Sequence, residues 1–133
     1  MSLRLLRSYH DEIIRLVAIQ GLMGEVHRIK YQPQPDSSAL IKSESPHITF
    51  SDGAYLRFAE LVVAEGRSIK RLKYSYHYER EGYFFRYDKD LERARPYCHH
   101  ETHLHANQEN VRFITHETSF EEVFNFIMKC FYA

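Results

Sequence analysis

The chain has 133 residues, of which 44% are hydrophobic and 14% aromatic, so we expect one well-packed domain spanning residues 1–133. Its 18 basic and 18 acidic side chains cancel at neutral pH, which argues against a protein held to nucleic acid by a strong overall field. A local basic patch is compatible with this balance, because Arg67, Lys70, Arg71 and Lys73 follow one another with no acid between them.

A helix is predicted at each end of the chain. Residues 3–19 carry apolar side chains at helical spacing, and Gly21 follows as a stop. Near the other end, Ser119 and Glu122 match a capping box, which marks the start of a second helix. The apolar side chains that recur at helical spacing after this box are Phe120, Val123, Phe124, Ile127 and Phe131.

Between the two helices, the pattern predicts short extended segments separated by turn residues. Pro46 interrupts one of them, which suits an edge strand or a bulge. The expected strands are residues 25–31, 39–50, 55–63, 69–79, 83–88, 103–105 and 111–116. Strands and helices do not alternate, so a parallel sheet is disfavoured. We therefore expect an α+β fold with an N-terminal helix, a central antiparallel β-sheet of about five to seven strands, and a C-terminal helix packed on the sheet.

The two strands at residues 69–79 and 83–88 predict a hairpin whose faces differ sharply. We expect Tyr78 to pair with Tyr83 across a four-residue loop, so that side chains alternate between two faces. One face then carries Tyr74, Tyr76, Tyr78, Tyr83, Phe85 and Tyr87. The other carries Lys73, Ser75, His77, Phe84, Arg86 and Asp88. We expect the aromatic face to pack in the core, with a base-stacking surface for RNA as the alternative.

Histidines are unusually dense near the end of this region, at His99, His100, His103 and His105. A His-x-His pair on a strand brings two imidazoles to one metal ion, with His77, Asp88 or Glu60 as a third ligand. A second chemistry is metal-free cleavage of a phosphodiester, in which one imidazole takes the ribose 2′-hydroxyl proton and another protonates the leaving oxygen. Arg86 or Lys73 would then hold the phosphate. The third interpretation is structural, with partly exposed histidines making ordinary hydrogen bonds.

Glu60 shares the strand alternation of Leu56, Phe58 and Val62, so we expect it in or near the core. A buried acid needs a partner, and Arg57 and Arg71 are the candidates. A bulge that turns Glu60 outward is the alternative.

Two segments are distinctive, Tyr74-Ser75-Tyr76-His77-Tyr78 and Phe85-Arg86-Tyr87-Asp88. With Phe50-Ser51-Asp52-Gly53, Leu56 and Glu60, a His-His pair and a following His-x-His, the chain resembles the TumE-like family of small bacterial and archaeal proteins. The resemblance spans nearly the whole chain. It implies the toxin component of a type II toxin–antitoxin module, bound and neutralised by a cognate helix-turn-helix antitoxin.

The leading hypothesis from these residues and this resemblance is a toxin that acts as a metal-independent endoribonuclease without a cofactor. The expected catalytic residues are His103 and His105 as the acid–base pair, His77 as an orienting or alternate base, Arg86 as the phosphate clamp, and Asp88 as the group that fixes an imidazole tautomer. The expected RNA-binding residues are Lys73, Arg71 and Tyr76.

Two other functions remain open at this point. A metal-dependent hydrolase would use the same histidines as ligands for a divalent metal, and a non-catalytic module would dock RNA or a protein. The expected partners are the antitoxin and an RNA substrate, and a homodimer is left open. Charges spread through the first twenty residues predict no signal peptide, and two cysteines fit a reducing compartment. We therefore expect a cytoplasmic protein that does not contact a membrane.

Overall fold

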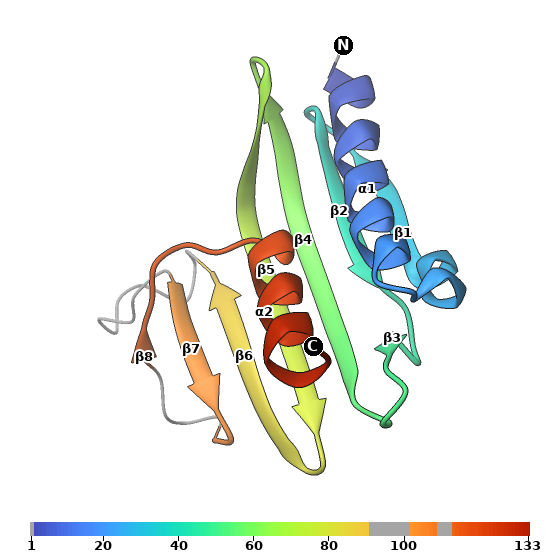
Figure 1. The fold of residues 1–133 in the computed structure, drawn as a ribbon. Helices are drawn as coiled ribbons and strands as arrows, with labels where there is room; N and C mark the ends of the chain where they lie inside the picture. The colour runs from blue at the N-terminus through green and yellow to red at the C-terminus, as the bar shows by residue number, and fades with distance from the viewer. Residues whose placement is uncertain (1, 91–101, 109–112) are drawn as a thin grey trace.

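The computed structural model describes residues 2–90, 102–108 and 113–133. Over these residues, eight strands form one antiparallel sheet accompanied by two α-helices (Figure 1). The main strand order is β1-β2-β4-β5-β6-β7-β8, and the short β3 pairs with β4. The elements are α1 (Ser2–Ile19), a 3₁₀ helix (Met23–Arg28), β1 (Ile29–Gln34), β2 (Ser38–Ser43), β3 (Ile48–Thr49), β4 (Tyr55–Glu65), β5 (Ser68–Arg80), β6 (Tyr83–Lys89), β7 (Thr102–Ala106), β8 (Phe113–Ile114) and α2 (Phe120–Phe131).

The predicted α+β architecture is confirmed, with two of the eight strands only two residues long. The N-terminal helix ends at Ile19 as expected, and the predicted cap of α2 is present because Ser119 Oγ accepts a hydrogen bond from the backbone N–H of Glu122 at 3.2 Å. The expectations for His99, His100 and most of the loop 90–97 fall outside the described residues. Neither described helix combines the length and hydropathy that crossing a membrane requires.

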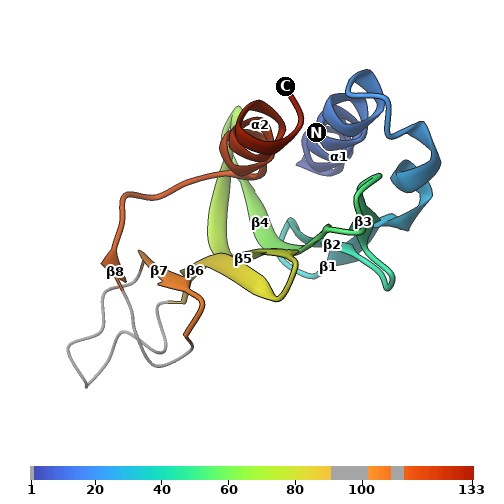
Figure 2. The same cartoon turned by 60° about the horizontal axis from the view of Figure 1, so that its bottom comes forward.

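Both helices cover the same face of the sheet, with α1 on the β1–β2 side and α2 over β5 (Figures 1 and 2). Their buried side chains interlock with those of the central strands, and the ring of Phe120 lies 4.6 Å from the ring of Phe58 and 5.4 Å from that of Phe124. No described helix or strand covers the other face (Figure 2). We call it the open face, and its residues include Arg57, Lys73, Ser75, His77, Arg86, Asp88, His103 and His105.

The strand predicted at residues 25–31 is wrong over most of its length. A 3₁₀ helix occupies Met23–Arg28, and strand β1 begins only at Ile29. The carboxylate of Glu25 accepts a hydrogen bond from Arg28 at 2.5 Å and two more from the backbone and hydroxyl of Thr49 at 2.9 and 2.6 Å. The contact with Arg28 stabilises the 3₁₀ helix, because residues three apart are aligned in such a helix. The contacts with Thr49 fix the helix against β3.

The β5–β6 hairpin has the predicted faces but not the predicted pairing. Tyr83 pairs with Arg80 and Tyr78 pairs with Phe85, so the loop has two residues where four were expected. Glu81 and Gly82 both have positive φ, 51° and 83°, which suits the two-residue turn that matches strand twist. Because the pairing differs by two residues, each side chain stays on its predicted face.

A bulge in β5 separates two basic residues that the sequence suggested would act together. Leu61 of β4 pairs with Lys73, while the next residue, Val62, pairs with Arg71, so Leu72 is an extra residue in the ladder. Lys73 therefore belongs to the open face, and Arg71 shares the helix-covered face with Val62. The predicted RNA-binding role of Arg71 does not fit this position, because its guanidinium lies beneath the helices rather than on the open face.

Arg71 instead belongs to a buried polar network centred on Glu60. The Glu60 side chain is fully buried and accepts hydrogen bonds of 2.5 Å from the hydroxyls of both Tyr9 and Tyr76. The Arg71 Nε lies 3.8 Å from the same carboxylate and donates to the Tyr9 hydroxyl at 3.3 Å. Burial of Glu60 and the partnership with Arg71 were both predicted and are confirmed, while Arg57 lies on the opposite face.

Burial raises the pKa of the Glu60 carboxyl above its ordinary value. A raised acid pKa adds stability below the pKa of the unfolded chain, about 4.3, and this contribution is lost as pH rises through the folded value. Relative to Glu60→Gln, the wild-type protein should therefore lose free energy of unfolding as pH rises above about 4.3, by at most about 1.4 kcal/mol per pH unit.

Urea unfolding of the two proteins across pH 4–8 measures this difference. Glu12→Gln, an exposed substitution on α1, is the matched control and should run parallel to the wild type. Parallel curves for Glu60→Gln as well would show that this carboxyl has the same pKa in the folded and unfolded chains.

Candidate active site

The candidate site lies where β6 and β7 pair on the open face. Asp88 pairs with His103, and Arg86 pairs with His105. Within each strand the two residues are two positions apart, so all four side chains point to the same side of the sheet. The site thus consists of Arg86, Asp88, His103 and His105, because each strand places these polar side chains away from the aromatic core.

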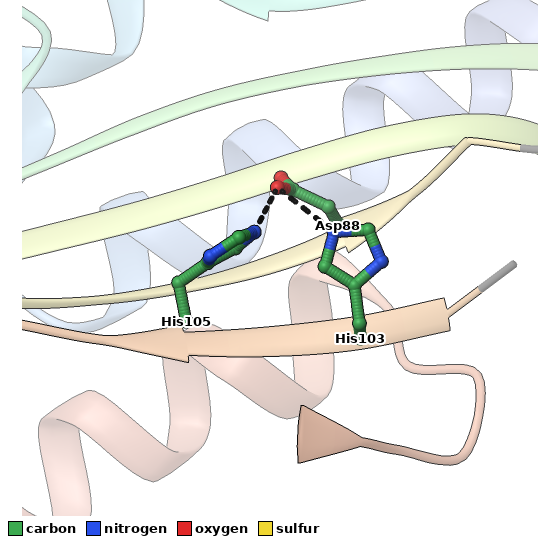
Figure 3. A group of neighbouring side chains, drawn as sticks. All are labelled: Asp88, His103 and His105. Atoms are coloured by element: carbon green, nitrogen blue, oxygen red, sulfur yellow. Dashed lines mark ion pairs between the residues drawn. The ribbon is translucent and has the colours of Figure 1, made fainter. Parts of the chain in front are cut away.

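The Asp88 carboxylate is the hub of this cluster (Figure 3). Its Oδ2 atom lies 3.6 Å from His103 Nε2 and 3.4 Å from His105 Nε2, and it accepts a 2.8 Å hydrogen bond from Arg86 Nε. The two imidazole rings meet edge to face, with centroids 4.8 Å apart. The sequence-predicted residues Asp88, His103, His105 and Arg86 are therefore brought together.

The two histidines differ in access. His103 is 7% exposed and lines a cavity of about 650 Å³ on the open face, whereas His105 is 2% exposed and lies outside the cavity lining. A molecule held in this cavity can therefore reach His103 directly. His105 Nε2 lies 3.4 Å from the same carboxylate oxygen, in a position suited to orienting Asp88 and, through it, the ring of His103.

The cavity extends from the cluster across the sheet to β2. Its lining is partly apolar and carries charges of both signs, with the acids Asp88 and Asp90 at and just beyond the end of β6 and cations on the neighbouring strands, the pattern of a site for an organic ligand with a charged group. The lining residues that matter most are Leu40, Leu61, Arg57, Lys73, Arg86 and His103. Lys73 was predicted to bind RNA, and the structure places it at this cavity with an exposed side chain.

His77 lies in the neighbouring row and not at the hub. It pairs with Arg86, but its Nε2 lies 3.1 Å from the Glu79 carboxylate, and its ring stacks on Phe84 with centroids 4.9 Å apart. Burial, with a smaller effect from Arg57, lowers the pKa of His77. Its predicted role as an orienting or alternate base is not supported by any contact between the described atoms of His77 and Asp88.

Tyr76 is fully buried, and its hydroxyl donates to Glu60 on the helix-covered face. The predicted stacking of Tyr76 on an RNA base is therefore wrong, because a ring with no exposed surface cannot contact a nucleobase. Core packing, the preferred prediction for the aromatic face, is confirmed for Tyr74, Tyr76 and Tyr78.

Sequence reasoning missed the cavity beyond the cluster. Arg57 was considered only as a partner for Glu60, although strand alternation places it on the other face. Leu40 and Leu61 were missed because apolar residues in a strand are normally assigned to the core. Strand alternation could have placed them on the open face. Leu61, for example, lies between Glu60 and Val62, which are both buried on the helix-covered face.

Three metal-ligating groups are close together in the same cluster. One donor atom each from Asp88, His103 and His105 lies within 4.8 Å of the others, and two imidazoles with a carboxylate suit several divalent metals. Against this, Arg86 donates a hydrogen bond to Asp88 Oδ2, so a cation bound to that oxygen would lie beside a positive guanidinium. The donor set fits a metal, and its immediate electrostatic environment opposes one.

Comparison with known proteins identifies one family. A family model described as Toxin TumE matches residues 25–130, which confirms the resemblance drawn from the sequence. No curated protein and no solved structure matches the chain. The matched range contains every residue of the cluster and of the cavity.

Proposed function

This chain belongs to the TumE toxin family, and we propose that it acts as an endoribonuclease whose catalytic centre is the Asp88–His103–His105 cluster. The observation that carries this proposal is one carboxylate in contact with two imidazoles and an arginine, beside a cavity with further cations. Imidazoles exchange protons near neutral pH, and guanidinium and ammonium groups bind phosphate. These are the components that RNA transphosphorylation requires.

The role of each residue in the reaction follows from whether its side chain reaches the cavity. His103, which reaches the cavity, takes the proton of a ribose 2′-hydroxyl as that oxygen attacks the adjacent phosphorus. Asp88 stabilises the imidazolium that forms, and Arg86 offsets the charge that develops on the phosphate oxygens. The bond to the 5′-oxygen breaks on the opposite side of the phosphorus, this leaving oxygen takes a proton from water, and His103 afterwards releases its proton to the solvent. The products are one RNA end with a 2′,3′-cyclic phosphate and one with a 5′-hydroxyl.

The test is incubation of untagged protein with a defined RNA in excess EDTA. We expect cleavage to persist and to leave cyclic phosphate ends. Cleavage that appears only after a divalent metal is added would make Asp88, His103 and His105 ligands of a metal-dependent hydrolase, the second candidate, which their 4.8 Å grouping favours. No cleavage under either condition would favour a non-catalytic binding module.

Asp88→Asn is expected to lower the cleavage rate by about 10–100-fold, because residues that orient a catalytic group contribute on this scale. The amide keeps the size of the side chain and removes its charge, so folding should be preserved. Single-turnover rates measure the effect, and Asp11→Asn, an exposed change on α1, is the matched control. A rate equal to that of Asp11→Asn would remove Asp88 from the proposed centre.

A toxin family implies an antitoxin as partner. We propose that this partner is a helix-turn-helix protein encoded beside the toxin, and that toxin and antitoxin act in the cytoplasm. Co-expression of the neighbouring gene should restore growth to cells that produce the toxin. Light scattering of the isolated toxin would decide whether it forms the homodimer that the sequence left open.

A further inference from the structure

We propose that the open-face cavity binds one unpaired nucleotide of single-stranded RNA, with its base against Leu40 and Leu61 and its phosphate between Lys73 and Arg57. This inference rests on the proposed function and specifies its substrate class. It concerns the part of the cavity that extends away from the Asp88–His103–His105 cluster.

The base half of the site is an apolar patch on the same face as the polar cluster. Leu40 pairs with Leu61, and both are partly exposed on the side of the sheet away from the helices. Ala59 lies two residues from Leu61 on the same face and also lines the cavity. Apolar side chains on the uncovered face of an antiparallel sheet favour a ligand that removes them from water. A nucleobase supplies a flat apolar surface of this kind.

The hydrogen-bonding edge of a base has a counterpart at the rim of the same patch. Gln34, at the end of β1, lines the cavity and is exposed. Its side-chain amide provides both a donor and an acceptor, and these are the groups that contact base edges in RNA complexes.

The phosphate half is formed by two cations that make no ion pair with any described residue. Lys73 pairs directly with Leu61, and Arg57 lies two residues before Ala59 on the same strand. Both side chains are exposed and line the cavity. Lys73 therefore stands between the apolar patch and the catalytic cluster, where the backbone of a bound strand would pass.

The register connects this site to the cluster. Ala59, Ser75, Asp88 and His103 form one row across four strands. Neighbouring strands are about 4.8 Å apart, so β5 lies roughly 10 Å from His103, two strand spacings away. A strand of RNA bound along this row would therefore extend from the base site to the reacting bond.

A hollow in a sheet face selects single-stranded over double-stranded RNA. In an A-form duplex the bases are stacked and paired, and proteins contact mainly its backbone and minor groove. An unpaired base is free to turn out of the stack and enter the cavity. The volume of about 650 Å³ is within the ordinary range for a site that holds one small ligand.

Binding is measured by fluorescence anisotropy with a labelled 2′-fluoro RNA, which lacks the attacking hydroxyl and so cannot be cleaved by the proposed reaction. Lys73→Gln should weaken binding about tenfold and reduce the slope of log Kd against log salt by about 0.7, the value for one phosphate contact on a single strand. Lys129→Gln makes the same charge change on α2, on the far side of the sheet, and should bind like the wild type. Equal losses in the two variants would overturn the phosphate site.

Leu61→Thr tests the base site, because threonine keeps the strand preference and replaces apolar contact with a hydroxyl. We expect binding about fivefold weaker than in Leu72→Thr, a matched change at a residue that does not line the cavity. A duplex of the same sequence should bind at least tenfold more weakly than the single strand. Equal binding of both variants, or of both RNA forms, would overturn the inference.

These outcomes are separable from the proposed function. If the protein binds 2′-fluoro RNA through Lys73 and Leu61 but cleaves no RNA, the nucleotide site is correct and the catalytic proposal fails. If it cleaves RNA while Lys73→Gln and Leu61→Thr bind normally, the catalytic proposal holds and the nucleotide site fails.

Discussion

His103→Asn should lower RNA cleavage by about 10²–10⁴-fold, the range that a positioned proton-transfer group contributes. Asparagine retains a polar side chain beside Asp88 but cannot take up a proton at neutral pH. Because His103 lies on the open face and outside the apolar core, the variant should fold normally. Single-turnover cleavage in EDTA measures the loss, and the midpoint of thermal unfolding verifies the fold.

Two further variants make this result specific. His27→Asn changes an exposed histidine in the 3₁₀ helix and should cleave at the wild-type rate. His105→Asn should cost less than His103→Asn, since His105 is 2% exposed and lies outside the cavity lining, where we propose that it orients the Asp88 carboxylate. Equal large losses for His103→Asn and His105→Asn, with RNA binding intact, would support the acid–base pair predicted from the sequence. Wild-type activity in His103→Asn would exclude the proposed centre.

Arg86→Gln should reduce the rate of the chemical step by about 10²–10³-fold, as expected when one preorganised donor to a developing anion is removed. Arg86 also donates to Asp88 Oδ2 at 2.8 Å, so the variant leaves the carboxylate less well held. Arg86→Lys restores the charge without the planar fork and should recover only part of the rate. Rates at saturating protein separate this effect from weaker binding of RNA.

Arg15→Gln, on the exposed surface of α1, removes the same charge far from the cluster and should leave the rate unchanged. If Arg86→Gln affects only the protein concentration needed for half-maximal rate, Arg86 binds RNA without assisting the reaction. If Arg86→Gln is as active as Arg15→Gln, the phosphate clamp lies elsewhere.

The sequence predicted most of the fold because its two periodicities are strong. Helical spacing located both helices, and strand alternation assigned the hairpin side chains to the correct faces even though the pairing was displaced by two residues. The cluster of Asp88, His103 and His105 followed from the same alternation once β6 and β7 paired. The burial of Glu60 was predictable for the same reason, since a single acid interrupted an apolar stripe.

The features that sequence reasoning missed depend on distant partners. The 3₁₀ helix at Met23–Arg28 is held through Glu25 by Thr49, 24 residues away, which no local pattern reveals. The two-residue turn at Glu81 required a non-glycine residue with positive φ, a conformation that propensity disfavours. The different faces of Arg71 and Lys73 arise from the pairing of β5 with β4, which the sequence of β5 alone does not contain.

The extra residue at Leu72 divides positive charge between the two sides of the sheet. If Leu72 instead paired with Val62 in a regular ladder, Arg71 would replace Lys70 opposite Val63 on the open face, and Glu60 would lose the cation that now lies 3.8 Å from it. One inserted residue that took over the pairing with Val62 would have this effect, whereas deletion of Leu72 would leave Arg71 on the helix-covered face. The bulge therefore makes this end of β5 more tolerant of a one-residue deletion than of a one-residue insertion.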